Sequence, residues 1–401
     1  MPIAGIVCEY NPFHRGHAYQ LTELRRHLGA DGAIVCVMSG NFVQRGDFAL
    51  LNKHSRAEAA VCAGADLVLE LPVCWATASA ERFAEGAVGL LQATGLVDTL
   101  CFGSESGAAA PFREAAAYLC DVRFPALLCA CLQEGCSFPA ARQRAVERLA
   151  GKPFPLLQSP NDLLGVEYAK AMQKRNADWE LLPLRRRGAR HDGPPQDGYA
   201  SASYLRRELS AGRDVSPYLT EDMLAIVRRE QAAGRSFASS ALCERAMLAQ
   251  LRRLPEEALR PYDGGGEGLY HRVYGAIQEG TSLAEILCLA KTKRYTHSRL
   301  RRMLLHAYLE LPTEPMPLPY LRVLAVGAGG RRLLQRMKQV AALPLILQPS
   351  QVRRCGEPAC RAMELESRTT DLYALAQPTV GKAGQEWKQG AIWREEQRDG
   401  L

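Results

Sequence analysis

Two histidines near the start of the chain have the side-chain type and spacing to act together on a phosphate. His14 and His17 lie three residues apart in the segment EYNPFHRGH, residues 9–17. Two imidazoles over one phosphate can donate hydrogen bonds to charge that grows in a transition state, and Gly16 lets a phosphate chain approach the backbone closely. The segment lacks the Gly-Lys-Ser/Thr of a phosphate-binding loop, and a zinc site would need a third ligand. The alternative is that either histidine merely caps a helix.

The elements that flank this segment would place both histidines in one pocket. Ile3–Cys8 is a short apolar run typical of a buried strand, and Gly16–His27 has the apolar spacing of an amphipathic helix. In an open parallel sheet, ligands bind beyond the carboxyl ends of the strands, often at the first strand–helix turn. The helix start would also offer free N–H groups and a positive dipole end, which suit phosphate. We therefore expect a phosphate site at this turn.

The first two hundred residues alternate strand and helix patterns. The further predicted strands are Ala33–Met38, Leu67–Leu71, Thr99–Phe102 and Trp179–Leu184, and the further predicted helices are Lys53–Ala63, Ala80–Ala93 and most of residues 111–176. This alternation implies an α/β fold, with a Rossmann-like parallel sheet and helices on both faces. From Ala200 onward strand signals nearly vanish and apolar residues recur at helical spacing. The pattern predicts an α/β domain over residues 1–212 and a mainly α-helical domain over residues 213–401.

The positive charge of the chain is concentrated in one stretch of the C-terminal half. The 401 residues include 50 Lys+Arg and 43 Asp+Glu, for a net charge of +7. Residues 291–338 contain 11 basic and 2 acidic residues, so the rest of the chain holds 39 basic and 41 acidic ones. A stretch with a net charge of +9 beside a nearly neutral remainder indicates a polyanion-binding face.

The composition of the basic stretch favours RNA as that polyanion. Cationic side chains neutralise phosphates, while aromatic rings stack on unpaired bases. The alternative is a solvated helix face, but ordinary surfaces mix charges of both signs. Arg331, Arg332, Arg336 and Lys338 follow a glycine run and would extend the face. The predicted RNA-binding residues are Lys291, Lys293, Arg294, Tyr295, Arg299, Arg301 and Arg302.

The cysteines and the apolar runs point to a reducing compartment. The 13 cysteines are scattered singly, without the paired spacing of a zinc site. No secretory signal is recognisable, and no apolar run reaches the ~18 residues that a membrane helix needs. We expect a cytoplasmic protein with no protein-bound metal site and no membrane partner.

Several motifs in order along the chain resemble those of the bacterial tRNA(Met) cytidine acetate ligase family. They are EYNPFHRGH at residues 9–17, MSGNFVQRG at 38–46, FGSE at 102–105, SPN at 159–161, ASASYLR at 200–206 and KTKRYT at 291–296. The resemblance places the chain in the nucleotidyltransferase superfamily with the HIGH signature. It implies activation of acetate by ATP as acetyl-adenylate, followed by acetyl transfer to N4 of the wobble cytidine, C34, of elongator tRNA(Met). Neither step requires a protein nucleophile, so positioning and charge stabilisation should supply most of the catalysis.

The resemblance also assigns residues to the ATP site, with His14 and His17 as the catalytic pair on the phosphates. Asn161 would contact the nucleotide, and its alternative is an N-cap. Gly103 would let the nucleotide lie against the backbone, and its alternative is a turn glycine. The ATP-contacting arginine falls at Arg186 or Arg187, because Arg190 stands where the family has a tyrosine. The implied ATP-binding residues are Val7, Cys8, Glu9, Tyr10, Asn11, Pro12, Phe13, His14, Arg15, Gly16, His17, Ala18, Tyr19, Gln20, Gly103, Asn161, Arg186, Arg187, Ser201 and Ser203.

A polar segment after the second predicted strand should face the same crevice, because it follows a strand end. Ser39, Asn41, Gln44 and Lys53 would hold acetate or the incoming cytidine, and the alternative is a solvated loop. ATP usually arrives with Mg²⁺, but the sequence names no protein ligand for it.

Two other functions remain open at this point. One is adenylylation of a small phosphorylated metabolite, against which the extra helical half and its basic face argue. The other is a non-catalytic RNA-binding factor that uses its nucleotide site as a switch.

Overall fold

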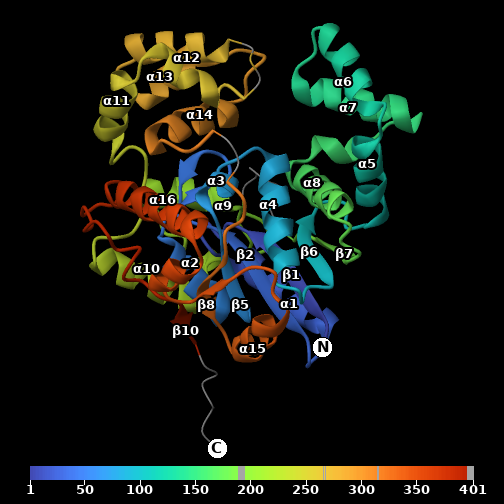
Figure 1. Cartoon of the computed structure of the whole chain (residues 1–401), viewed down its shortest axis with the longest axis vertical. Helices are drawn as coiled ribbons and strands as arrows, with labels where there is room; N and C mark the ends of the chain where they lie inside the picture. The colour runs from blue at the N-terminus through green and yellow to red at the C-terminus, as the bar shows by residue number, and fades with distance from the viewer. Residues whose placement is uncertain (188–194, 265, 267, 314–315, 395–401) are drawn as a thin grey trace, which may run out of the picture.

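The chain folds around one central sheet (Figure 1). The computed structural model describes residues 1–187, 195–264, 266, 268–313 and 316–394. Within them the sheet has the strand order β10-β8-β5-β2-β1-β6-β7, with β9 beside β8. Its strands are β1 (Ile3–Cys8), β2 (Ala33–Ser39), β5 (Leu67–Leu71), β6 (Thr99–Ser104), β7 (Glu180–Arg185), β8 (Leu321–Val326), β9 (Leu345–Ile346) and β10 (Ile392–Trp393). A separate hairpin is formed by β3 (Phe42–Val43) and β4 (Asp47–Phe48).

The strands of the N-terminal half run parallel, which confirms the predicted α/β fold class. β1 pairs with β2 on one side and with β6 on the other, β2 pairs with β5, and β6 pairs with β7, all in parallel. Apolar residues dominate these strands, and β2 and β5 are buried at every residue. Such strands need helices on both faces, which the intervening segments supply.

The residues beyond Ala200 are mainly helical, as predicted, but they also contribute strands to the sheet. β8, β9 and β10 all come from residues beyond 320, and β8 joins the sheet antiparallel to β5. β8 is buried along its whole length. A strand buried on both faces reads as a continuous apolar run and is easily taken for part of a buried helix. The sheet therefore draws strands from both sides of the predicted boundary at residues 212 and 213, and that boundary stays a prediction.

Two apolar cores lie on opposite faces of the sheet. Successive residues of β1 alternate between them, with Ile3 in one and Ala4 in the other. The first core packs α4, α5, α8 and α15, and the second packs α1, α2, α9 and α10. These helices are α1 (Arg15–Leu28), α2 (Lys53–Cys62), α4 (Ala80–Ala93), α5 (Ala110–Cys120), α8 (Pro160–Lys174), α9 (Ala202–Ser210), α10 (Glu221–Ala232) and α15 (Gly330–Val340).

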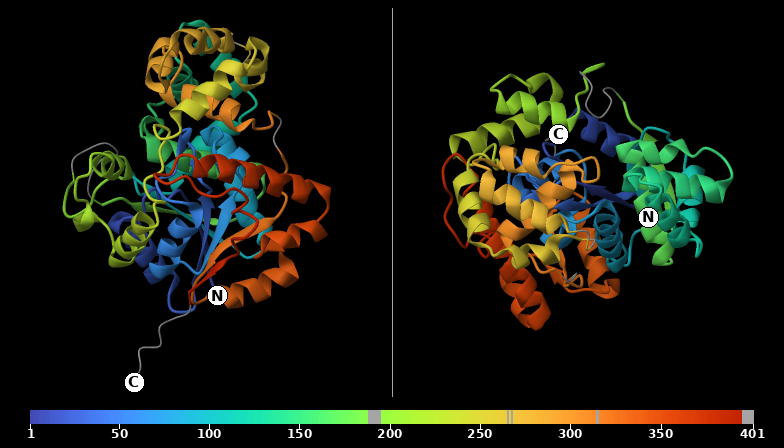
Figure 2. Two further views of the ribbon diagram at one scale, coloured as in Figure 1. Left: turned by 90° about the vertical axis from the view of Figure 1, so that its left-hand side faces the viewer. Right: turned by 90° about the horizontal axis from the view of Figure 1, so that it is seen from above.

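Two helical lobes stand above the same end of the sheet (Figures 1 and 2). One is the hairpin of α6 (Phe124–Gln133) and α7 (Phe138–Ala150), whose inner side belongs to the first core. The other has a core of its own and consists of α11 (Glu244–Arg253), α12 (Leu269–Glu279), α13 (Leu283–Ala290) and α14 (His297–Leu309). A smaller core joins this second lobe to the β3–β4 hairpin, α3 (Val73–Ala76) and α16 (Glu357–Ala374).

Among the described residues, no single helix is long and apolar enough to cross a membrane. α5 and α6 reach that length and apolar character only as a pair, which is bent by 82°.

Candidate nucleotide site and basic cleft

The strand order creates a crevice at the carboxyl ends of β1 and β6. From β1 the chain continues to β2 and β5 on one side of the sheet, whereas β6 continues to β7 on the other side. Ligands of open parallel sheets bind where the strand order reverses in this way. The loop that carries His14 follows β1, and Gly103 lies near the end of β6, so both predicted segments meet at this crevice.

His14 is the N-cap of α1. Its Nδ1 accepts a hydrogen bond from the Gly16 amide at 3.0 Å, which leaves Nε2–H as the donor of a neutral ring. A Cβ on Gly16 would lie 2.9 Å from the His14 ring, so this glycine makes room for the cap. The prediction that the start of α1 offers free amides is corrected, because the His17 amide is also bonded to the His14 carbonyl. His14 thus both caps the helix and lines the cavity.

His17 stacks directly on His14. The ring centroids are 3.7 Å apart, and Tyr10 and Phe13 pack against the other side of the His17 ring. Burial, followed by the positive charge of Arg186, lowers the pKa of His14 to about 3. Burial and the neighbouring His14 lower the pKa of His17 well below its usual value. Both rings are therefore neutral donors and acceptors, and His17 Nδ1 is buried without a partner among the described residues.

The opposite side of the cavity is built by the ends of β6 and β7. The Arg186 side chain lies against Gly103, where an added Cβ would come within 3.3 Å of it. Arg186 Nη1 lies 3.5 Å from Asn161 Oδ1, and Asn161 Nδ2 donates to Glu105 Oε1 at 2.7 Å. Arg187 instead lies over the Tyr19 ring, 4.5 Å from its centroid. Both arginines line the cavity, with Arg186 the nearer to the histidines.

Asn161 is not the N-cap of α8, which was the alternative to a nucleotide contact. Ser159 caps α8 by accepting a hydrogen bond from the Asp162 amide. Asp162 in turn accepts hydrogen bonds from Ser104 Oγ at 2.6 Å and from the Glu105 amide at 3.0 Å. The sequence did not predict that Asp162 and Glu105 contribute to this site, although Glu105 lies in the FGSE motif. The Asn161 side chain is thereby free to face Arg186.

α9 brings a second helix start to the loop of the histidines. Ser201 caps this helix through a hydrogen bond from the Tyr204 amide, and its hydroxyl lies 3.1 Å from that of Ser203. Arg206 Nη1 donates to the Asn11 carbonyl at 2.7 Å and so ties α9 to the loop after β1. Ala200 lines the cavity beside Tyr199.

The segment Val7–Gln20 is divided between the cavity and the interior. Tyr10, Asn11 and Phe13 are buried, and the Asn11 side chain accepts a hydrogen bond from the Leu50 amide. Arg15 donates to the Leu219 carbonyl. Segment residues that line the cavity are His14, Gly16, His17, Tyr19 and Gln20. Arg190, which stands where the family has a tyrosine, lies outside the described residues.

The four residues predicted for acetate or cytidine do not share one pocket. Lys53 is buried, with Nζ 2.6 Å from a Glu70 oxygen and 2.8 Å from a Glu386 oxygen. Asn41 accepts a hydrogen bond from the Lys53 amide and donates to Thr370. The prediction that these two side chains face the crevice is corrected, because an internal network of hydrogen bonds and ion pairs holds them.

Gln44 and Ser39 lie differently. The Gln44 backbone N–H donates to Glu9 Oε1 at 2.7 Å. The Gln44 side-chain Nε2 donates to the Ala78 carbonyl at 3.1 Å. Ser39 is buried at the end of β2, and its hydroxyl has no partner among the described residues. These two remain close to the end of the first strand.

Four of the predicted RNA-binding residues line a wide cleft between the two helical lobes. Its volume is about 1180 Å³, and Lys293, Arg294, Arg299 and Arg302 line one wall. Arg299 donates to the Asp263 carbonyl and lies 5.2 Å from the Tyr295 ring centroid. The positively charged start of α14 therefore lines the cleft.

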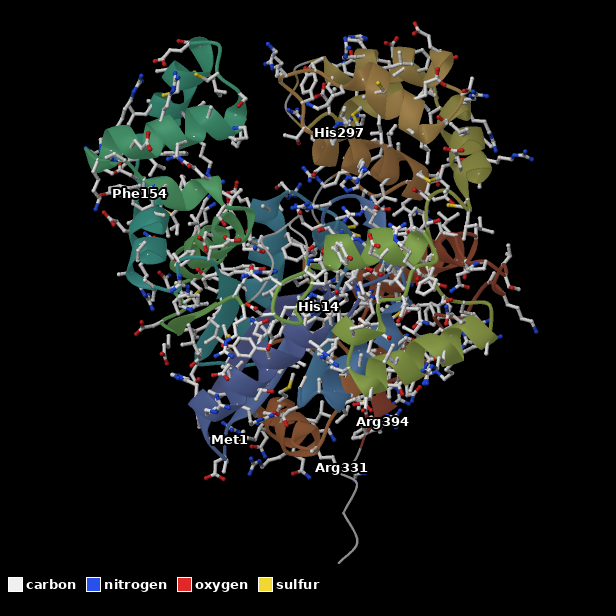
Figure 3. The ribbon with its side chains drawn as sticks, turned by 180° about the vertical axis from the view of Figure 1, so that it is seen from behind. Met1, His14, Phe154, His297, Arg331 and Arg394 are labelled. Carbon is white, nitrogen blue, oxygen red and sulfur yellow. The ribbon has the colours of Figure 1, made fainter. Side chains whose placement is uncertain are left out.

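Parts of the basic stretch are placed elsewhere. The expectation that Tyr295 stacks on RNA is corrected by its burial in the core of the second lobe, and Lys291 Nζ is bonded to the Thr292 and Tyr295 carbonyls. Arg301 is exposed but does not line the cleft. Arg331 lies at the end of the molecule opposite His297, so α15 does not extend the basic face (Figure 3).

The β3–β4 hairpin connects cleft and crevice. Ala78, whose carbonyl is bonded to Gln44, lines the cleft. At the tip of the hairpin, Gly46 packs so tightly on the Arg301 and Arg302 backbone that an added Cβ would lie 2.5 Å from the Arg302 nitrogen. The inner end of the cleft therefore adjoins the loop that carries Glu9 and His14.

Comparisons with known proteins agree with this architecture. A family model described as HIGH Nucleotidyl Transferase matches residues 1–387. The tRNA(Met) cytidine acetate ligase of Acetivibrio thermocellus is 34% identical, over 98% of this chain and 100% of that protein. The one from Listeria monocytogenes is 36% identical, over 94% and 95% respectively. The crystal structure of Thermotoga maritima TmcAL bound with alpha-thio ATP has a TM-score of 0.91 at 30% identity and covers 98% of this chain and 100% of that one.

Proposed function

The chain belongs to the tRNA(Met) cytidine acetate ligase family within the HIGH nucleotidyl transferases, and from this premise we propose that it acetylates a tRNA cytidine with acetate and ATP. The acceptor is N4 of the wobble cytidine, C34, of elongator tRNA(Met). The observation that carries the proposal is the stacked pair His14 and His17 at the strand-order reversal, in a chain with a relative that binds an ATP analogue. The reaction takes place in two steps.

In the first step, an acetate oxygen attacks the α-phosphorus of ATP, acetyl-adenylate forms and pyrophosphate leaves. His14 Nε2–H donates to the phosphates, because its Nδ1 is already held by the Gly16 amide. His17 offers the buried Nδ1, which has no partner among the described residues, to the same phosphates. Neutral imidazoles suit this role, since they stabilise growing charge without a proton transfer of their own.

The nucleotide is held by the groups opposite the histidines. Arg186 and Asn161 flank Gly103, where the absence of a side chain leaves space for the ribose or the base. Ser201 and Ser203 at the start of α9 would contact the triphosphate. Mg²⁺ would arrive on the triphosphate, since no group of three or more His, Cys, Asp or Glu suited to a metal occurs among the described residues.

In the second step, the cytidine amine attacks the acetyl carbon, N4-acetylcytidine forms, and AMP and a proton leave. Ser39 and Gln44 are the members of the predicted acetate and cytidine pocket that lie nearest the end of β1. The RNA would approach through the basic cleft, with Lys293, Arg294, Arg299 and Arg302 on its phosphates. A cytoplasmic location follows from a tRNA substrate.

The test uses the purified chain with ATP, carbon-14 acetate and total RNA. We expect label in RNA, and mass analysis of the anticodon nucleosides should find N4-acetylcytidine in elongator tRNA(Met). Pyrophosphate release without label in RNA would indicate the small-metabolite adenylyltransferase instead. ATP binding without turnover would indicate a nucleotide-switched binding factor.

A further inference from the structure

The wall of the cleft opposite the basic residues comes from the N-terminal half of the chain. Leu132, Gly135, Ser137 and Phe138 line it from the tip of the α6–α7 hairpin. Arg82, in the first turn of α4, lines the same cleft. None of these residues belongs to the basic stretch, so the cleft combines two regions of the chain that lie far apart in sequence.

The charges of the cleft call for an anionic occupant. Arg302 is half-buried, and neither Arg302 nor Arg82 makes a side-chain hydrogen bond or ion pair with the described residues. Burial and the neighbouring Arg299 lower the pKa of Arg302 to about 10. Asp263 is the acidic residue among the described residues that line the cleft, and one of its carboxylate oxygens lies 3.5 Å from Arg299. A cleft lined by cations from α4 and from the start of α14 fits a chain of phosphates.

Phe138 adds a feature that a phosphate chain alone would not require. Its side chain is 54% exposed at the mouth of the cleft, whereas neighbouring apolar residues of the hairpin, such as Cys131 and Ala141, are fully buried. These buried residues pack the two helices of the hairpin together, and exposed ion pairs from Arg144 and Arg148 to Glu134 also join them. An exposed aromatic ring in a cleft that is also lined by cations is the arrangement that binds unpaired, unstacked bases.

We propose that the α6–α7 hairpin is the second jaw of an RNA clamp, in which Phe138 stacks on an unpaired loop base while Arg82 and Arg302 bind phosphates between the jaws. The occupant is a single-stranded RNA loop, because a double helix keeps its bases stacked inside. This inference rests on the proposed function and deepens it, since it adds a base-stacking residue and a phosphate contact from outside the basic stretch.

The test compares single variants with tRNA(Met) as the substrate. Phe138→Ala should raise the KM for tRNA about 5- to 100-fold, as expected for loss of one stacked base. Acetate-dependent ATP–pyrophosphate exchange without RNA should be unchanged. Phe138→Tyr should restore the KM and Phe138→Leu should not, because the leucine retains apolar area but has no aromatic face. Val122→Ala is the matched control, since Val122 is 91% exposed beside α6 and does not line the cleft.

A salt titration separates the two kinds of contact. Arg82→Gln should reduce the slope of log K for tRNA against log salt by about 0.7 to 0.9, whereas Phe138→Ala should weaken binding with the slope unchanged. Unchanged KM in Phe138→Ala, or full activity in Phe138→Leu, would overturn the clamp. Absence of RNA acetylation by the unaltered chain would instead refute the proposed function, so the two failures are distinguishable.

Discussion

The nucleotide cavity and the basic cleft differ in how their polar groups are held. In the cavity, His14, Arg206 and Asp162 are each bonded to backbone groups or to neighbouring side chains, and the two histidines are neutral. In the cleft, Lys293 is exposed and Arg302 has no anionic partner among the described residues. Phosphoryl chemistry needs donors fixed in advance, whereas RNA binding needs cations that are still available. The difference indicates that the catalysis depends on geometry and the RNA binding on charge.

The largest effect should come from the cavity. His17→Ala should lower the rate of acetate-dependent ATP–pyrophosphate exchange about 100- to 1000-fold, because a donor to developing charge is lost. Filter binding of labelled tRNA should be unchanged, since the cleft is intact. The matched control is His27→Ala, which removes a half-exposed imidazole from the last turn of the same helix and should leave the exchange rate unaltered. Exchange at the normal rate in His17→Ala would refute the assigned role.

Lys53 tests whether the interior network belongs to either site. Lys53→Met leaves Glu70 buried without its cation and leaves Glu386 with Arg322 alone, and removal of one partner of a buried pair costs about 3 to 5 kcal/mol of unfolding free energy. Urea unfolding measures this loss. Lys152→Met, which removes an exposed pair with Glu114, should leave the unfolding free energy nearly unchanged. If the Lys53→Met protein were stable and had a raised KM for acetate, Lys53 would belong to the acetate pocket and not to an internal network.

Gly16 provides a smaller test of the fixed geometry. Gly16→Ala places a methyl group against the His14 ring and should reduce the exchange rate about tenfold by displacing that donor. Gly275→Ala is the matched control, because no atom lies within 4 Å of the added Cβ on α12. It should leave the activity unchanged and stabilise the chain by up to about 1 kcal/mol. Equal activity of the two variants would contradict the importance of the cap.

The smallest effect concerns the pH dependence of activity. With a pKa of about 3 for His14 and a strongly lowered pKa for His17, both rings stay neutral near neutral pH. Exchange activity should therefore be flat between about pH 6 and pH 8. A fall in activity with a midpoint near pH 6.5 would show that a histidine of the pair does titrate.

The same lowered pKa values affect stability in a defined direction. Unfolded histidines take up protons near pH 6.5, while folded His14, and His306 with a pKa of about 4, stay neutral. Below pH 6.5 the unfolded state binds more protons, so the unfolding free energy is lost as the pH falls toward those values. The thermal midpoint should fall between pH 7 and pH 5. A midpoint that rises over this interval would contradict the assigned burial.

The sequence predicts local features of the first half well. Ile3–Cys8, Leu67–Leu71 and Ala80–Ala93 have the predicted bounds, because each has a clear period and a clear punctuating residue. The sequence predicts His14 at the crevice for the same reason, since His14 follows a recognisable strand, whereas the role of Gly103 comes from the family resemblance. What depends on distant partners was not predictable in this way. Lys53 meets Glu386 from the far end of the chain, and β8 pairs with β5 across more than two hundred residues.

The basic stretch shows the limit of counting charges. Its 11 cations suggested one face, but Arg322 is buried beside Glu386, and α15 lies at the opposite end of the molecule from His297 (Figure 3). Of the cations of this stretch among the described residues, those that line the cleft are Lys293, Arg294, Arg299 and Arg302, around the start of α14. The sequence of the α6–α7 hairpin has no charge excess that would predict its place beside the cleft. The structure identifies this side of the cleft through the exposed apolar Phe138.

The division of labour between cavity and cleft is tested most directly with the double variant Lys293→Gln/Arg294→Gln. Two activities are measured on the same preparation: acetate-dependent ATP–pyrophosphate exchange without RNA, and transfer of labelled acetate to tRNA(Met) at two salt concentrations. We predict unchanged exchange, transfer efficiency at least about tenfold lower, and a flatter salt dependence. A parallel loss of both activities, or full transfer in the variant, would contradict the account.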